Sequence, residues 1–222
     1  GCRSEDWIKN GRQGAFEVNN FTSPAFVARV NYHGVKGLRV GASFYYNQTA
    51  KNGTKPWRNT GYKFPVTIVT GDLQYKGFNN NLIVRGNAVY GNLGASGALT
   101  TINNSSSAAS GYPNTTVAQN AVSYGGEAGY NIGSFFHSKA PRIYPFIRYE
   151  YYNPMEKTEA NTGLLADKRF QVSAVTAGLN YYALPNLVIK ADYTHRSIGG
   201  GKYNDENLVS VGIAYIGWFI KK

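Results

Sequence analysis

The sequence ends on the run Glu206-Asn207-Leu208-Val209-Ser210-Val211-Gly212-Ile213-Ala214-Tyr215-Ile216-Gly217-Trp218-Phe219-Ile220-Lys221-Lys222. One series takes every second position: Val209, Val211, Ile213, Tyr215, Gly217 and Phe219. A second series fills the positions between them: Ser210, Gly212, Ala214, Ile216 and Trp218. Because successive side chains of a β-strand point to opposite faces, this spacing predicts a strand whose two faces have different surroundings.

The same spacing recurs along the rest of the chain, between segments rich in turn residues. It predicts eight further strands, near residues 26–33, 38–47, 64–77, 82–90, 122–132, 143–152, 170–182 and 187–196. Pro145 interrupts the sixth of them, and a proline is tolerated at a sheet edge or a bulge. Residues 1–22 are polar and rich in turn residues, so we expect a loop with Trp7 as a candidate packing anchor.

The predicted connections alternate between short turns and long polar segments. The longest, residues 93–117, is rich in Ser, Gly, Asn and Thr, and a connection of this length is either functional or mobile. A meander with alternating short and long connections is typical of transmembrane β-barrels, whereas sandwiches need Greek-key crossovers. We therefore expect an all-β, antiparallel meander barrel that crosses a membrane. It forms a single domain, residues 1–222, with 1–22 loop-like and 23–222 carrying the barrel strands.

The composition is compatible with such a barrel. The 222 residues include 18 Tyr and 26 Gly, and only 16% are charged. Mean hydropathy is −0.36, but barrel strands bury only alternate residues in lipid, so a low mean value does not argue against them. Aromatic residues near the short turns are expected to form a girdle at one membrane interface: Tyr32, Tyr75, Tyr130, Tyr181 and Phe219. A soluble sandwich or ligand-binding barrel also fits this composition.

Other classes of function find little support in the sequence. The single Cys2 excludes an internal disulfide framework and a cysteine-rich zinc site. The net charge of +11 is dispersed, so we expect no nucleic-acid partner. Asp192, His195 and Ser197 are residue types of a catalytic triad, but on one strand they cannot all face the same way. We expect no enzyme activity, no catalytic residue, no cofactor and no metal.

Strand counting leads to a prediction about the whole protein. Single-chain bacterial barrels have an even number of strands with both ends on the periplasmic side. If the final strand ends on the periplasmic side, an odd number of strands such as nine would place the beginning of the first strand on the outer side. Either residues 1–22 supply a tenth strand or an N-terminal part is missing. We prefer the second, because residues 1–22 have the character of an outer loop.

Three stretches resemble a known family: Gly37-Leu38-Arg39-Val40-Gly41-Ala42-Ser43-Phe44-Tyr45-Tyr46, the hairpin around residues 81–90, and residues 185–196 with the closing strand. They are similar to the carboxy-terminal portion of Bacteroidetes outer-membrane porins related to the phosphate-selective porin O and P group. The resemblance implies a sixteen-stranded, usually trimeric pore in the bacterial outer membrane. It would contact outer-membrane lipid and pass small hydrophilic solutes or anions. The arginine ladder of that group has no residue-by-residue match here.

The strand phases assign a set of charged residues to the inner, pore-lining face. The basic ones are Arg29, His33, Arg39, Lys76, Arg85, Arg148, Lys190 and Arg196, and the acidic ones are Asp72, Glu127, Glu150 and Asp192. Arg148 with Glu150, and Lys190 with Asp192, are two residues apart and could form ion pairs along one strand. Fixed charges bias which ions enter a pore. These charges either neutralise one another or, through the surplus of arginine, favour anions.

Three hypotheses on function follow. The first is an outer-membrane porin that allows passive diffusion of small hydrophilic solutes. The second is a non-conducting barrel whose long connections, residues 93–117 and 153–168, bind a ligand or a partner. The third is a soluble β-barrel that binds a small ligand.

Overall fold

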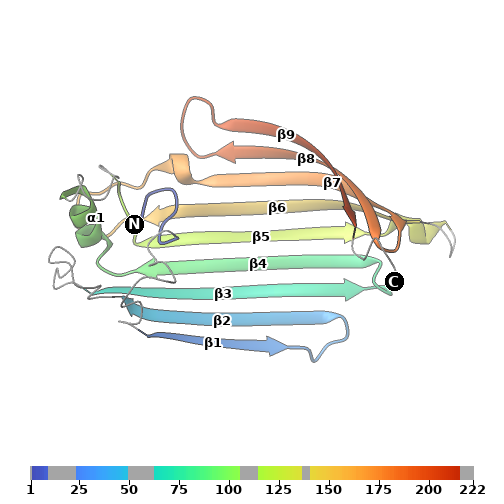
Figure 1. The fold of residues 1–222 in the computed structure, drawn as a ribbon, viewed down its shortest axis with the longest axis horizontal. Helices are drawn as coiled ribbons and strands as arrows, with labels where there is room; N and C mark the ends of the chain where they lie inside the picture. Colours follow the sequence, from blue (N-terminus) through green and yellow to red (C-terminus); the bar gives the residue numbers. More distant parts are fainter. Residues whose placement is uncertain (1, 10–23, 50–62, 106–114, 137–140, 216–222) are drawn as a thin grey trace, which may run out of the picture.

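The computed structural model describes residues 2–9, 24–49, 63–105, 115–136 and 141–215. They form one antiparallel sheet of nine strands in meander order (Figure 1). The strands are β1 (Ala25–Tyr32), β2 (Leu38–Thr49), β3 (Phe64–Gly77), β4 (Leu82–Leu93), β5 (Asn120–Tyr130), β6 (Arg142–Lys157), β7 (Val172–Leu184), β8 (Leu187–Ile198) and β9 (Asp205–Tyr215). The predicted all-β class, strand number and meander order are confirmed. The last strand was expected to run to Phe219, and residues 216–222 lie outside the described residues.

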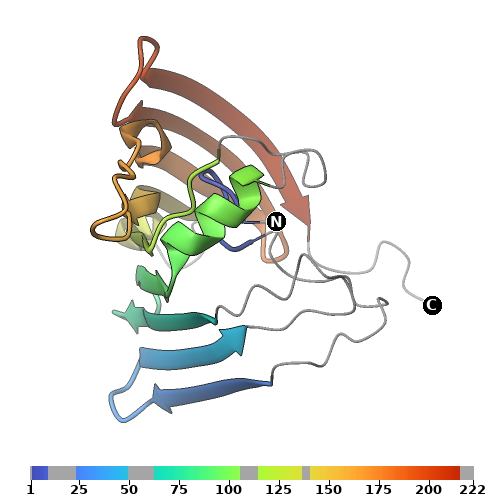
Figure 2. The ribbon, with the colours of Figure 1, turned by 90° about the vertical axis from the view of Figure 1, so that its left-hand side faces the viewer.

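The sheet curves into an open trough, which is seen end-on in Figure 2. The strands β1 and β9 form its two edges and, within the described ranges, are not paired with each other. The segment 2–9 adds no strand to the sheet and contains only an isolated bridge between Arg3 and Trp7. The rest of the segment 1–22 that was considered for a tenth strand, residues 1 and 10–22, is outside the described part of the chain.

The register aligns the alternation of all nine strands, so the sheet has two chemically different faces. Across β2, β3 and β4, for example, Val40 lies opposite Leu73 and Leu73 lies opposite Gly86. The convex side, here called the apolar face, carries large hydrophobic side chains that are exposed: Val30, Val40, Leu73, Ile147, Val175, Leu179, Ile189, Val209, Val211 and Ile213. The concave side, here called the charged face, carries the strand residues predicted to line the pore, whereas Asp205 at the start of β9 lies on the apolar side.

Aromatic residues lie near both ends of the apolar face. Four members of the predicted girdle lie where β1–β2, β3–β4, β5–β6 and β7–β8 are connected, here called the short-connection end: Tyr32, Tyr75, Tyr130 and Tyr181. A second group lies toward the opposite, long-connection end: Phe26, Phe44, Tyr46, Tyr90, Tyr124 and Tyr151. The residues between the two groups are mainly aliphatic or small. Phe219, the fifth predicted member of the girdle, is outside the described residues.

The strand ends differ from the prediction where prolines and turns intervene. The sixth strand continues to Lys157, because the β5–β6 register shifts between Asn120 and Val122 and the bulge accommodates Pro154. Pro145 lies one residue beyond Phe146, where the β5–β6 ladder ends. The fifth strand stops at Tyr130, and a 3-10 helix, η2 (Ile132–Phe135), follows it. Because β6 continues to Lys157, the connection from β6 to β7 is shorter than predicted, and it contains η3 (Lys168–Phe170).

The longest connection contains a helix that the sequence analysis does not predict, α1 (Ser96–Ser105). Its residues are mostly weak helix formers, so tertiary contacts must stabilise it. Leu99 packs against the buried core, and the Thr100 hydroxyl accepts a hydrogen bond of 2.9 Å from the Val117 backbone. The Glu159 carboxylate accepts a 2.6 Å hydrogen bond from the backbone nitrogen of Gly97 in the first turn. No helix in the described ranges is long and apolar enough to cross a membrane.

The main buried cluster lies on the charged face at the long-connection end. Its members come from the N-terminal segment, the sheet and the end of the longest connection: Trp7, Val66, Leu93, Val117, Ala118 and Met155. Trp7 therefore acts as the packing anchor that the sequence predicted. The curved sheet supplies one side of this core, and the N-terminal segment and the connection supply the other (Figure 2).

The position of this core leads to a stability prediction. Leu93 is 2% exposed, whereas Leu165 is 85% exposed. Leu93→Ala should lower the free energy of unfolding by about 2–5 kcal/mol, because it leaves a cavity in a packed cluster. Leu165→Ala is the matched control and should change it by less than about 0.5 kcal/mol. Denaturant unfolding followed by tryptophan fluorescence measures both, and equal effects would contradict the assigned core.

Candidate functional site

The eleven predicted pore-lining residues all lie on the charged face, because the register keeps the strands in phase. Two rows of paired residues cross the sheet. The first row contains Arg39, Gln74, Arg85, Glu127, Arg148, Thr176 and Thr194. The second contains Gly41, Asp72, Asn87, Gly125, Glu150, Ala174, Arg196 and Glu206. Charges far apart in sequence are thereby brought into two adjacent lines.

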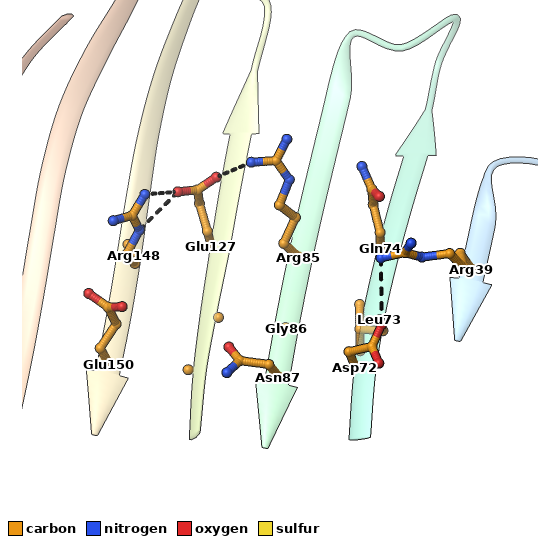
Figure 3. Close-up of a pocket in the computed structure, with 12 residues that line it drawn as sticks. Arg39, Asp72, Leu73, Gln74, Arg85, Gly86, Asn87, Glu127, Arg148 and Glu150 are labelled. Atoms are coloured by element: carbon orange, nitrogen blue, oxygen red, sulfur yellow. Dashed lines mark hydrogen bonds and ion pairs between the residues drawn. The ribbon is translucent and has the colours of Figure 1, made fainter. Parts of the chain in front are cut away.

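A hollow of about 460 Å³ lies over these rows near the middle of the sheet. Its polar lining comes from β2 to β6 (Figure 3) and consists of Arg39, Asp72, Gln74, Arg85, Asn87, Glu127, Arg148 and Glu150. The backbone of Gly86, Gly125 and Gly126 also lines it, and Gly125, which lies between Asn87 and Glu150 on the charged face, leaves the floor open because it has no side chain. The hollow is therefore a polar depression with guanidinium, carboxylate and amide groups around it.

The ion pairs in the hollow run across strands. The Arg148 guanidinium donates to Glu127 Oε2 from Nε at 2.9 Å and from Nη2 at 2.5 Å. Arg85 Nη1 lies 3.5 Å from Glu127 Oε1, so this carboxylate sits between two arginines, as Figure 3 shows. Arg85 on β4 and Arg148 on β6 are the residues directly opposite Glu127 in the two neighbouring strands.

The predicted pairs along single strands are wrong. Arg148 pairs with Glu127 and not with Glu150, and no ion pair joins Lys190 to Asp192 in the part of the chain that the structure describes. The physical reason is distance. Direct neighbours on adjacent antiparallel strands have Cβ atoms about 5 Å apart, whereas residues i and i+2 of one strand are separated by about 7 Å.

A second pair depends on a glycine. Arg29 on β1 reaches past β2 to Asp72 on β3, with Nη2 to Oδ2 at 2.7 Å. Gly41 lies between them, and a Cβ atom at this position would be 2.2 Å from Arg29 Nη2 and 2.7 Å from Asp72 Oδ2. Arg39 Nη2 lies 3.5 Å from the other oxygen of Asp72. The absence of a side chain at position 41 therefore allows Asp72 to pair with two arginines.

The outermost pair includes a residue that the sequence analysis missed. Arg196 Nη1 lies 2.6 Å from Glu206 Oε2 across the β8–β9 ladder, and Arg196 Nη2 donates to the Tyr152 hydroxyl at 3.0 Å. The alternation of the final strand does contain the signal, since Glu206 has the same parity as Ser210. Extending the series of every second position back from Ser210 through Leu208 reaches Glu206.

The remaining predicted residues are not part of the hollow. Lys76, Lys190 and Asp192 lie on the charged face but nearer the short-connection end. His33 follows the end of β1, in the connection to β2. The structure thus brings together six of the predicted residues at the hollow: Arg39, Asp72, Arg85, Glu127, Arg148 and Glu150.

Exposure shows which groups a solute would meet first. The arginine side chains are 48% exposed at Arg39, 57% at Arg85 and 42% at Arg148. The carboxylates are less accessible, at 25% for Asp72 and 19% for Glu127. Guanidinium N–H groups therefore dominate the accessible surface of these ion pairs. Their donors suit oxygen atoms of an anion or of a hydroxyl-rich solute.

A cluster on the apolar side of β8 and β9 resembles a triad only in composition. The Ser197 hydroxyl donates to Asp205 Oδ1 at 2.9 Å, and His195 Nε2 lies 3.9 Å from the same oxygen. A nucleophile would need its hydroxyl bonded to the imidazole, whereas here both groups contact the carboxylate. Asp192 lies on the opposite face of β8, as the sequence predicted. Among the described residues, no group of three or more His, Cys, Asp and Glu side chains could hold a metal ion.

Comparison with models of protein families and with curated proteins finds no match to this chain.

The position of Gly41 leads to a second prediction. Gly41→Ala should remove the Arg29–Asp72 contact, because the guanidinium must move away from the new methyl group. A double-mutant cycle with Arg29→Gln and Asp72→Asn should give a coupling of about 0.5 kcal/mol in the wild-type background and near zero with Ala at 41. The cycle for Arg196→Gln and Glu206→Gln is the control and should not change. An undiminished coupling between positions 29 and 72 would contradict this role of Gly41.

Proposed function

We propose that this chain is part of an outer-membrane porin that lets small hydrophilic solutes diffuse passively, with a preference for anions. The observation that carries the proposal is the division of one nine-stranded sheet into an exposed apolar convex face and a charged concave face. A lipid-embedded barrel requires this division, with apolar side chains outward and polar ones toward a water-filled lumen.

Strand length supports the membrane assignment. The strand β3 has 14 residues. At about 3.3 Å per residue it is about 46 Å long, and a tilt of about 45° reduces its span to about 33 Å. The apolar band of an outer-membrane barrel is about 25 Å tall and has aromatic girdles at both interfaces. The two aromatic groups at the ends of the apolar face match that arrangement.

The exposure of the apolar face argues against a soluble ligand-binding domain. Soluble domains rarely expose a contiguous apolar patch larger than a few hundred Å². Here Val30 at one edge and Val211 at the other are 72% and 76% exposed, and exposed hydrophobic side chains continue across the strands between them. Contact with lipid would remove these hydrophobic side chains from water.

The open edges support a barrel larger than these nine strands. In the described residues β1 and β9 each have a single neighbouring strand. Unpaired backbone groups inside a bilayer are strongly unfavourable, so further strands must close the cylinder. The similarity of residues 37–46, 81–90 and 185–196 to Bacteroidetes porins is consistent with sixteen strands and a trimer.

The preference for anions rests on the hollow. Its three arginines present more accessible surface than the carboxylates with which they pair. A fixed charge about 7 Å from a passing ion contributes about 0.6 kcal/mol in water, which corresponds to about a threefold change in local ion concentration. Exposed guanidinium groups would therefore raise the anion concentration beside Arg85 and Arg148 more than the shielded Glu127 lowers it, and the exposed Glu150 opposes this effect.

Planar-bilayer recordings test conduction and selectivity together. Glu127→Gln removes the carboxylate between Arg85 and Arg148, and should raise the anion-to-cation permeability ratio by up to about threefold. Arg85→Gln should lower it by a similar factor. The reversal potential in a KCl gradient measures both. Lys202→Gln, in the connection between β8 and β9, is the control for charge alone and should leave the ratio nearly unchanged. If the protein conducts no ions, the porin proposal fails.

The membrane orientation of the sheet can be tested at two adjacent positions. Val211 belongs to the apolar face, and its neighbour Ser210 belongs to the charged face. Val211→Arg should destabilise folding into lipid bilayers by about 2–4 kcal/mol, because it places a charge against hydrocarbon. Ser210→Arg should have a much smaller effect. Folding titrations in lipid vesicles give both values, and equal penalties would contradict a lipid-facing apolar side.

A further inference from the structure

The N-terminal segment is held against the inside of the trough. Residues 2–9 fold into a turn in which the Arg3 backbone nitrogen donates to the Trp7 carbonyl at 3.0 Å, and that of Lys9 donates to the Asp6 carbonyl at 3.0 Å. Trp7 has a φ of 49°, in the left-handed region that a bulky residue rarely occupies. Surrounding contacts must stabilise this conformation, and it directs the indole ring into the cluster on the charged face.

Several contacts dock this turn, including a 3.2 Å hydrogen bond from the Ser4 backbone nitrogen to the Thr115 hydroxyl and one of 3.2 Å from the Asn103 amide to the Cys2 carbonyl. The Trp7 ring covers Gly91 of β4, where an added Cβ atom would be 2.1 Å from the ring. Its indole Nε1 donates to the Ala118 carbonyl at 3.0 Å. The Ser4 hydroxyl donates to the Thr116 carbonyl at 2.8 Å. The segment 2–9 and the end of the longest connection are thus joined to each other and to the sheet.

The docked turn lies at one end of the charged face, and the hollow lies further along. Gly91 and Asn87 are on the same strand and the same face, four residues apart. At about 3.3 Å per residue, this separates the Trp7 ring from the edge of the hollow by about 13 Å along β4. A solute that moves from the long-connection end toward the hollow must pass the side of the trough that Trp7 and Ala118 occupy.

We infer that the turn 2–9, docked through Trp7, narrows the lumen and sets the upper size of the solutes that reach the charged hollow. This inference rests on the proposed porin function. Trp7 is the specificity-determining residue, since its ring joins the turn to β4 and to Ala118. Because the turn also carries charged side chains, among them Arg3 and Glu5, the effect of size is isolated by using neutral solutes.

Two variants undock the turn by different routes. Trp7→Ala removes the ring. Gly91→Ala leaves residues 2–9 intact but places a methyl group where the ring lies. Gly71→Ala is the matched control, a glycine on the neighbouring strand β3 whose added Cβ atom would have no atom within 4 Å. Because Gly91→Ala changes only the floor beneath the ring, it keeps the inference testable if Trp7→Ala fails to fold.

Docking itself has a natural reporter, Cys2. It is the sole cysteine of the sequence and packs against the buried cluster, and burial raises the pKa of its thiol. Undocking exposes the thiol and lowers its pKa, and both changes speed reaction with a maleimide. We expect modification to become about tenfold faster or more in Trp7→Ala and Gly91→Ala, since both disrupt a packed tryptophan site. The control Gly71→Ala should react at the wild-type rate.

Liposome swelling with neutral sugars of graded size measures the functional effect. Both undocking variants should admit oligosaccharides that the wild-type protein excludes, while monosaccharide flux changes little. If Cys2 reacts faster but the size limit does not change, the turn is not the constriction. If neither variant accelerates Cys2 modification, Trp7 does not hold the turn. Both results overturn the inference and leave the porin function standing. A wild-type protein that admits no sugar would defeat the porin function itself.

Discussion

The backbone hydrogen-bond ladder from β1 to β9 is the constraint on which the rest of the structure depends. It keeps nine alternating patterns in phase, so that Arg39, Arg85 and Arg148 share one face while Val40 and Val211 share the other. A slip of one residue between any two strands would move a whole set of charges to the apolar side. Both the exposed hydrophobic surface and the polar hollow follow from this single register.

Small residues decide how the charges on that face are arranged. With no side chain at Gly41, Arg29 can pair with Asp72 two strands away. Gly125 keeps the floor of the hollow free, and Glu127 is held between two arginines beside it. The arginines remain the more exposed partners, which is the basis for the proposed preference for anions.

The long-connection end combines the packed core with the proposed size filter. A helix of weak helix formers, the turn around Trp7 and residues 115–118 bury an apolar cluster against the charged face. The same contacts that stabilise this core occupy part of the trough beyond the hollow. In the proposed porin, stability at this end and solute size would therefore depend on the same residues.

Alternation at a spacing of two is a local property, so the sequence alone determined the nine strands, their order and the face of every predicted charge that lies on a strand; His33, which lies in the connection after β1, is the exception. The pairing of those charges was different. Arg148 with Glu127, and Arg29 with Asp72, are joined by register across strands and by a glycine, not by nearness in the chain. The helix α1 depends on contacts with Val117 and Glu159, which are 17 and 62 positions from their partners, and the docking of Trp7 on Ala118 joins residues 111 positions apart. Only the tertiary structure decided these features, because their stability comes from packing between distant segments and has no local pattern.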